Sequence, residues 1–236
     1  MKSYSILSAY YDALFVDEEN VEKWADFTER HAEKGRILEL AAGSGAISEA
    51  LVKRGFALTL SDLSTDMLLE AEKKFGNALE YHVLDMRDFR VSEPYDTVIC
   101  YNDSLNYLTE DEELTQCFSC VNQALKTGGV FLFDMHSTLR LEEFSEEYIE
   151  EGEVADAQYQ WTIEAEDDML CHHITFWKEN DVFSEEHIQR IYSLDTITEM
   201  LEKSGFSCQI YGDFDQKDLT EAEKWFFVCH KREEIC

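Results

Sequence analysis

The chain has 236 residues, of which 44% are hydrophobic and 30% charged, so a packed fold is expected rather than disorder. Asp and Glu number 51 against 20 Lys and Arg, and the formal net charge of −31 argues against nucleic-acid and anionic-lipid substrates, which it repels. No run of about 18 apolar residues and no basic–apolar start is found, so neither a membrane span nor a signal peptide is predicted and a cytoplasmic location is expected.

The chain contains seven cysteines. Their odd number and the absence of a secretion signal favour free thiols over a disulfide framework. Cys117 and Cys120 lie on a predicted helix and are interpreted as packing thiols. Cys171, His172 and His173 follow one another on a predicted strand, where neighbouring side chains point to opposite faces. No metal site is therefore predicted.

Aromatic side chains are frequent in residues 3–15, which predict a helix that either caps the core or closes as a lid over a ligand. A second helix is predicted at 21–34. From there strands and helices alternate with short connections, which predicts a parallel sheet with helices on both faces. The strands are predicted at 36–40, 57–61, 79–84, 97–101 and 130–135, and the helices at 46–54, 65–75 and 111–125.

The pattern changes after residue 145. Extended segments separated by turn signals predict an antiparallel insertion of three strands, and the acidic runs 142–153 and 164–168 are interpreted as solvated faces. A helix and two strands, expected to pair as an antiparallel hairpin, end the chain. The three extended segments are predicted at 159–164, 170–178 and 182–192. The helix is predicted at 194–204 and the two strands at 206–211 and 225–230. Three parts are predicted. An N-terminal helical lid spans residues 1–34, the core spans 35–145 and 193–236, and a β insertion over the substrate site spans 146–192.

Residues 37–48 read I-L-E-L-A-A-G-S-G-A-I-S, an apolar strand, a glycine-rich turn and the start of a helix. Such a turn presents backbone N–H groups at a helix N-terminus, which suits a nucleotide. Glu39 lies in the strand, and a buried carboxylate there requires a cationic or hydrogen-bonding partner. Asp62 follows the next strand, about nineteen positions after Gly43, where a carboxylate can accept hydrogen bonds from both ribose hydroxyls.

The spacing of this turn does not fit a dinucleotide. The G-x-G-x-x-G fingerprint would place its third glycine at Ser48. Glu39 would also be placed unfavourably near a pyrophosphate. Both observations argue against an alternative function, that of a nicotinamide-dependent dehydrogenase. An acid at this position fits a cofactor with a positive charge and an amino group, such as S-adenosylmethionine.

E-L-A-A-G-S-G resembles the first motif of class I S-adenosylmethionine-dependent methyltransferases. The chain is similar to that family also at 60–64, 84–88, 95–108 and 125–134, so the resemblance covers about residues 35–135. It implies a Rossmann-like α/β fold, with a seven-stranded, mostly parallel sheet and an antiparallel final strand. Ala41 stands where the family usually has glycine, and its methyl group is tolerated if φ there is negative.

The resemblance also implies roles for individual residues. Gly43 and Gly45 let the backbone approach the methionine part of S-adenosylmethionine, and Glu39 lies near its amino group. Asp62 binds the ribose and Asp85 accepts from the adenine amino group. The implied cofactor-binding residues are Tyr11, Glu39, Ala41, Gly43, Gly45, Asp62, Leu63, Asp85, Met86, Tyr101 and Asn102.

Candidates for the methyl-acceptor site follow the fourth and fifth strands, since ligands bind at the carboxyl ends of parallel strands. These are Asp103, Ser104, Asp134 and His136. His136 and Asp103 are predicted as the catalytic pair, His136 as acid/base or substrate contact because a neutral imidazole can take a proton near neutral pH; an equal alternative is that His136 anchors a loop.

The expected activity is methylation of a nitrogen or oxygen of a small molecule, by a monomer or homodimer. A pocket wall could be supplied by the aromatic side chains of the insertion, although core packing explains them equally well. Two alternatives remain: a methyltransferase of a macromolecule, tRNA or protein, and a non-catalytic S-adenosylmethionine-binding protein.

Overall fold

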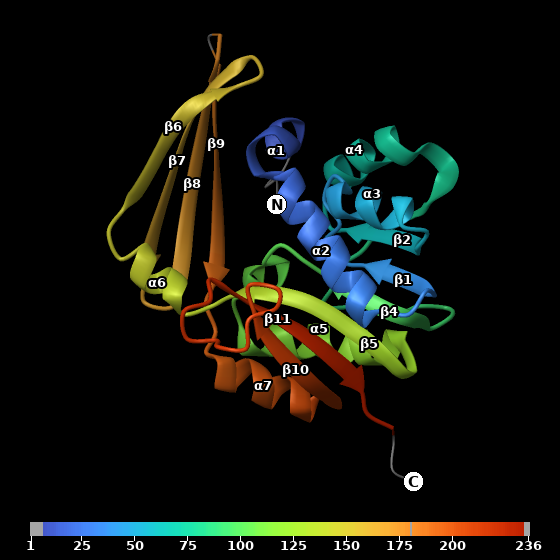
Figure 1. The fold of residues 1–236 in the computed structure, drawn as a ribbon. Helices are drawn as coiled ribbons and strands as arrows, with labels where there is room; N and C mark the ends of the chain where they lie inside the picture. The colour runs from blue at the N-terminus through green and yellow to red at the C-terminus, as the bar shows by residue number, and fades with distance from the viewer. Residues whose placement is uncertain (1–6, 180, 234–236) are drawn as a thin grey trace.

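The alternating strands and helices form one seven-stranded sheet in the computed structural model, which describes residues 7–179 and 181–233 (Figure 1). Its order is β10-β11-β5-β4-β1-β2-β3. The five strands from β5 to β3 are parallel, and β11 runs antiparallel to both β5 and β10. The predicted Rossmann-like sheet is therefore confirmed. Its strands are β1 (Arg36–Glu39), β2 (Ala57–Asp62), β3 (Glu80–Val83), β4 (Tyr95–Cys100), β5 (Leu125–His136), β10 (Phe206–Gly212) and β11 (Lys224–Lys231).

Helices cover both faces of this sheet and enclose two apolar cores. On one face α2, α3 and α4 bury side chains such as Phe27 and Leu51, and on the other α5 and α7 bury Phe118 and Leu201. The helices are α1 (Leu7–Phe15), α2 (Glu18–His31), α3 (Ala46–Lys53), α4 (Thr65–Phe75), α5 (Asp111–Ala124), α6 (Leu139–Glu143) and α7 (Leu194–Lys203), with the 3₁₀ turns η1 (Gly76–Ala78) and η2 (Ser104–Tyr107).

Local capping determines where the helices begin. Helix α4 begins as predicted, because the Ser64 side chain accepts a hydrogen bond from the Met67 amide at 3.3 Å. Helix α2 begins at Glu18 rather than at residue 21, because the Asp17 side chain accepts from the Glu19 amide at 3.1 Å. An Asp cap ahead of two glutamates was thus a start signal that the apolar spacing alone did not reveal.

The insertion forms a separate antiparallel sheet in the order β6-β7-β8-β9, which stands to one side of α1 in Figure 1. The prediction of three strands was wrong: β6 is a fourth strand, and all but its last residue lie in the acidic run 142–153, which was interpreted as a solvated face. Among the residues of β6, only Val154 is buried, so this edge strand shows little of the apolar alternation that marks a strand. The four strands are β6 (Tyr148–Val154), β7 (Ala157–Glu166), β8 (Met169–Lys178) and β9 (Asp181–Arg190).

Helix α1 connects the insertion to the glycine-rich turn. The Tyr10 ring stacks on Phe176 of β8, with ring centroids 5.2 Å apart. Two residues further on, Asp12 binds Lys74 at 2.6 Å and accepts a hydrogen bond from the Ser44 hydroxyl. The described part of the predicted lid therefore contacts both the core and the turn, while residues 1–6 of that lid lie outside the described residues.

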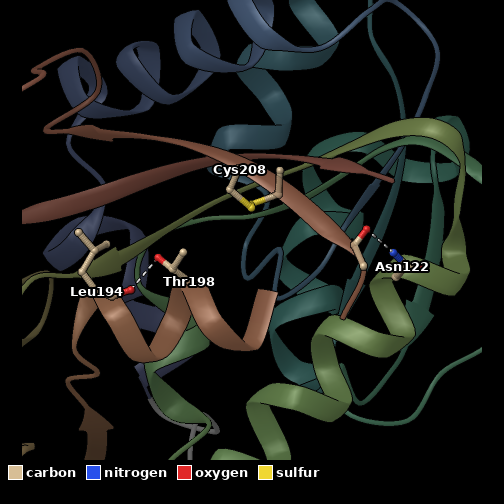
Figure 2. The surroundings of a disulfide bond; sticks show 6 residues. Asn122, Leu194, Thr198 and Cys208 are labelled. Carbon is tan, nitrogen blue, oxygen red and sulfur yellow. Dashed lines mark hydrogen bonds between the residues drawn. A yellow bond between two sulfur atoms is a disulfide. The ribbon is translucent and has the colours of Figure 1, made fainter. Parts of the chain in front are cut away.

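Cys208 and Cys229 face each other on β10 and β11 and are joined by a disulfide (Figure 2). The expectation that all cysteines are free thiols was wrong for this pair, because it came from their number and not from the strand register that places them opposite one another. Figure 2 shows the bond beside α7, where the Thr198 hydroxyl donates to the Leu194 carbonyl at 2.8 Å. Cys117 and Cys120 are free.

None of the helices among the described residues is long and apolar enough to cross a bilayer. Within the same residues, no set of three His, Cys, Asp or Glu side chains is grouped so that it could hold a metal ion.

Candidate active site

The glycine-rich turn between β1 and α3 is left-handed at several positions. Gly43 has φ of +56° and Gly45 has φ of +79°. A Cβ on Gly43 would meet no atom within 4 Å, whereas one on Gly45 would lie 2.8 Å from the Phe75 ring of α4. Gly43 therefore faces open space and Gly45 permits close helix packing. Ala41 has φ of +50°, so the condition of a negative φ at this position is not met, and the methyl group is accommodated at a cost of about 1–2 kcal/mol.

Glu39 lies beneath this turn and is 3% exposed. Its carboxylate accepts a hydrogen bond from the Ser48 hydroxyl at 2.6 Å. Burial raises the pKa of Glu39 to about 7, with a further contribution from the charge of Asp62. A cation near this buried carboxyl group would stabilise its ionised form and lower its pKa.

Asp62 ends β2 and holds the turn from the other side. One of its oxygens accepts from the Gly43 amide at 2.8 Å and the other from the Ser64 amide at 2.7 Å. Burial raises the pKa of Asp62. Further along, Asp85 binds Arg87, whose Nη2 lies 2.7 Å from Asp85 Oδ2, and this pairing lowers the pKa of Asp85.

A cavity of about 690 Å³ runs from this turn to the insertion sheet. Eleven of the predicted site residues line it: Tyr11, Ala41, Gly43, Asp62, Leu63, Asp85, Met86, Asn102, Asp103, Ser104 and His136. Glu39, Gly45 and Tyr101 lie outside the lining. Tyr101 is buried in the core, where its hydroxyl bonds Thr28 at 2.8 Å. The structure thus brings most of the predicted residues around one cavity.

Asp134 near the end of β5 organises the backbone beside this cavity and is fully buried. Its Oδ1 accepts from the Trp24 indole at 3.0 Å and from the Asn102 amide at 2.7 Å. Its Oδ2 accepts from the Asp103 amide at 3.1 Å and from Lys224 Nζ at 3.2 Å. Asn102 and Asp103 are both left-handed, with φ of +57° and +50°, so Asp134 fixes an unusual backbone and is not available as a base.

Lys224, at the start of β11, also binds Asp103 and lies over the Trp24 ring, 5.3 Å from its centroid. Burial alone would lower the pKa of Lys224, but Asp103 and Asp134 raise it above its usual range. Burial alone would raise the pKa of Asp103, but His136 and Lys224 hold it well below its usual range. Asp103 is therefore an ionised carboxylate inside the protein.

His136 completes this cluster. Its Nε2 lies 3.4 Å from Asp103 Oδ2, and its backbone amide donates to the Asn106 side chain at 3.1 Å. The His136 Nδ1 atom is buried and has no hydrogen-bond partner among the described residues. Nearby, the Tyr11 hydroxyl accepts from Asn102 Nδ2 at 3.2 Å, and burial raises the pKa of Tyr11 to about 12.

Several cavity residues were not predicted, among them Lys224, Gln189, His172 and Arg140. A signal for Lys224 was present. Since β11 runs antiparallel to β5, its first residue lies opposite the last residue of β5, and Lys224 is paired with His136 in the strand register. A lysine just before a predicted antiparallel last strand is thus placed at the ligand-binding edge. Gln189 and His172 gave no comparable signal within an insertion of unknown orientation.

Comparisons with known proteins agree with this geometry. A family model described as "Methyltransferase domain" matches residues 37–129. The chain is 33% identical over 244 residues to the putative methyltransferase YqeM of Bacillus subtilis (strain 168), covering 98% of each protein.

Two solved structures share the fold over almost the whole chain. An S-adenosylmethionine-dependent methyltransferase from Clostridium acetobutylicum ATCC 824 is 26% identical, with a TM-score of 0.83, over 98% of this chain and 99% of that one. The sugar N-methyltransferase KedS8 from Streptoalloteichus sp ATCC 53650 is 21% identical, with a TM-score of 0.78, over 97% and 93%. The chain therefore belongs to the class I S-adenosylmethionine-dependent methyltransferases.

Proposed function

We propose that this methyltransferase acts on a nitrogen or oxygen of a small molecule. The observation that carries the proposal is the cavity of about 690 Å³ that joins the glycine-rich turn to the insertion sheet, because this volume is typical of small-ligand sites. The net charge of −31 disfavours tRNA as the acceptor. KedS8, which shares the fold over 97% of this chain, is a sugar N-methyltransferase.

One end of the cavity fits S-adenosylmethionine. Glu39 supplies a buried carboxylate whose raised pKa suits a neighbouring ammonium group, Gly43 leaves open space beside the turn, and Asp62 presents a carboxylate for the ribose. Leu63 and Met86 line the part assigned to adenine. When bound, the cofactor supplies a methyl group on a sulfonium, and the surrounding residues orient it and exclude water.

The other end provides a proton acceptor. The ionised Asp103 carboxylate can only accept hydrogen bonds, so the His136 Nε2 that faces it carries the hydrogen. His136 Nδ1 then retains a lone pair, which can accept a hydrogen bond or a proton from the acceptor molecule. In this role His136 is the candidate base and Asp103 holds it in position.

Replacing Asp62 with alanine is expected to weaken S-adenosylhomocysteine binding about 100-fold, since two hydrogen bonds to a charged group contribute roughly 1.5 kcal/mol or more each. Isothermal titration measures this directly. Asp66→Ala, on the exposed side of α4, is the matched control and should bind like wild type. An unchanged affinity of Asp62→Ala, with its melting temperature near that of wild type, would exclude the ribose role.

The acceptor class is tested with a methyl-labelled cofactor. Purified protein is incubated separately with pools of amino sugars, small amines, phenols, tRNA and protein. Label in a small-molecule pool, lost in the His136→Gln variant, is the expected result. Label that accumulates chiefly in tRNA or protein would overturn the proposal.

A further inference from the structure

A line of hydrogen bonds crosses from the insertion sheet into the acceptor end of the cavity. Trp161 Nε1 lies 3.3 Å from His172 Nδ1, and His172 Nε2 lies 3.2 Å from Gln189 Oε1. Gln189 Nε2 then reaches Asp103, at 2.7 Å from Oδ2 and 3.3 Å from the backbone carbonyl. Gln189 is 2% exposed, and both ends of its amide are hydrogen-bonded within the protein.

The chemistry of the two ends permits only one arrangement of hydrogens in this line. Both Asp103 oxygens facing Gln189 are acceptors, so the amide nitrogen must point to Asp103 and the amide oxygen to His172. His172 Nε2 must then carry a hydrogen. The indole of Trp161 can only donate, so His172 Nδ1 must accept.

His172 and His136, two of the three imidazoles that line the cavity, are therefore not equivalent. Both nitrogens of His172 are engaged, and burial lowers the pKa of His172 to about 4, so this ring is neutral and fixed near neutral pH. His136 shares the same carboxylate through its Nε2, while its Nδ1 has no partner among the described side chains. Of the two rings, His136 is the one able to accept a proton.

We infer that Gln189 is a positioning residue, which together with His172 and Trp161 holds the Asp103 carboxylate in the orientation that fixes the His136 ring. The inference rests on the proposed function of the acceptor end. Gln189 and Asp103 are 86 positions apart in sequence, and their contact forms only when β9 packs against the core. The insertion sheet therefore contributes to acid–base chemistry and also covers the cavity.

The test is nitrogen NMR of protein with ¹⁵N-labelled histidine at pH 7, without acceptor. In wild type, His172 should be neutral with hydrogen on Nε2, and the ring-nitrogen signals of His136 serve as the reference. In Gln189→Leu, the ring-nitrogen signals of His136 should shift, although no hydrogen bond joins Gln189 to His136, and the water-protected Nε2–H signal of His172 should be lost. His136→Gln and His172→Gln provide the assignments.

Gln158→Leu, on an exposed face of β7, is the matched control and should leave both rings unchanged. An unaltered His136 signal in Gln189→Leu would overturn the inference. If Gln189→Leu fails to fold, hydrogen on Nδ1 of His172 in wild type would overturn it equally. Because no methyl transfer is measured, either result is separate from a failure of the proposed function, which the labelled-cofactor assay reports.

Discussion

Replacing Asp134 with asparagine is expected to lower the free energy of unfolding by about 3–5 kcal/mol, the range found when one partner of a buried charge pair is removed. The four donors around this carboxylate are the Trp24 indole, two backbone amides and the Lys224 ammonium. Asparagine has nearly the same shape, but its NH₂ group must face at least one of these donors. Lys224 also loses one of its two anionic partners.

The backbone adds to this effect. Asn102 and Asp103 are consecutive left-handed residues, a conformation that Asn and Asp tolerate but that still costs about 1 kcal/mol or more at each position. Both of their amides bond Asp134, so the substitution releases the segment that carries Asp103. Loss of cofactor and acceptor binding should accompany the loss of stability.

Urea unfolding of the cofactor-free protein measures the change. Asp215→Asn, at an exposed position in the loop before β11, is the matched control and should stay within about 0.5 kcal/mol of wild type. Lys224→Met removes the cation that pairs with both Asp103 and Asp134, so it should also lower the free energy of unfolding. Wild-type stability of Asp134→Asn would show that Asp134 does not hold this backbone.

The cofactor end could be predicted from sequence because its parts are close in the chain. Gly43 and Asp62 are 19 positions apart, within one strand–turn–helix–strand unit, and their relation is determined by local elements. The backbone conformation of Ala41 could not be predicted in this way. The turn imposes its left-handed φ, and the residue type alone does not reveal the sign of φ.

The acceptor end could be predicted only in part because it is assembled from distant segments. The position of Asp103 and His136 beside the cavity could be predicted, since both lie at the carboxyl ends of parallel strands. Lys224 lies 121 positions from Asp103, and its place depends on strand order and direction. Gln189 depends on how a separate sheet docks on the core, which no pattern within β9 encodes.

The same dependence on register explains the wrong expectation for Cys208 and Cys229. Their pairing follows from the register of β10 with β11. The number and spacing of the cysteines contain no information about that register. The fourth strand of the insertion, β6, was not predicted for a related reason. An edge strand with one buried residue shows little alternation of apolar and polar residues.

Replacing Glu39 with glutamine is expected to stabilise the cofactor-free protein in a pH-dependent way. Burial raises the pKa of Glu39 from 4.5 to about 7, so between these values the folded protein retains a proton that the unfolded chain releases. Wild-type stability therefore falls as pH rises through this window, by about 3 kcal/mol in total at roughly 1.4 kcal/mol per pKa unit. Glutamine carries no charge and avoids this loss.

The free energy of unfolding of Glu39→Gln should thus exceed that of wild type by less than about 1 kcal/mol at pH 5 and by about 3 kcal/mol at pH 8. Urea unfolding at half-unit steps of pH measures the difference, and Glu146→Gln, an exposed glutamate, should show none at any pH. Equal stabilisation at pH 5 and pH 8 would mean that Glu39 is already ionised at pH 5. The same variant should bind S-adenosylmethionine more weakly, because the gain in stability comes from removing the charge that we propose to lie near the cofactor's amino group.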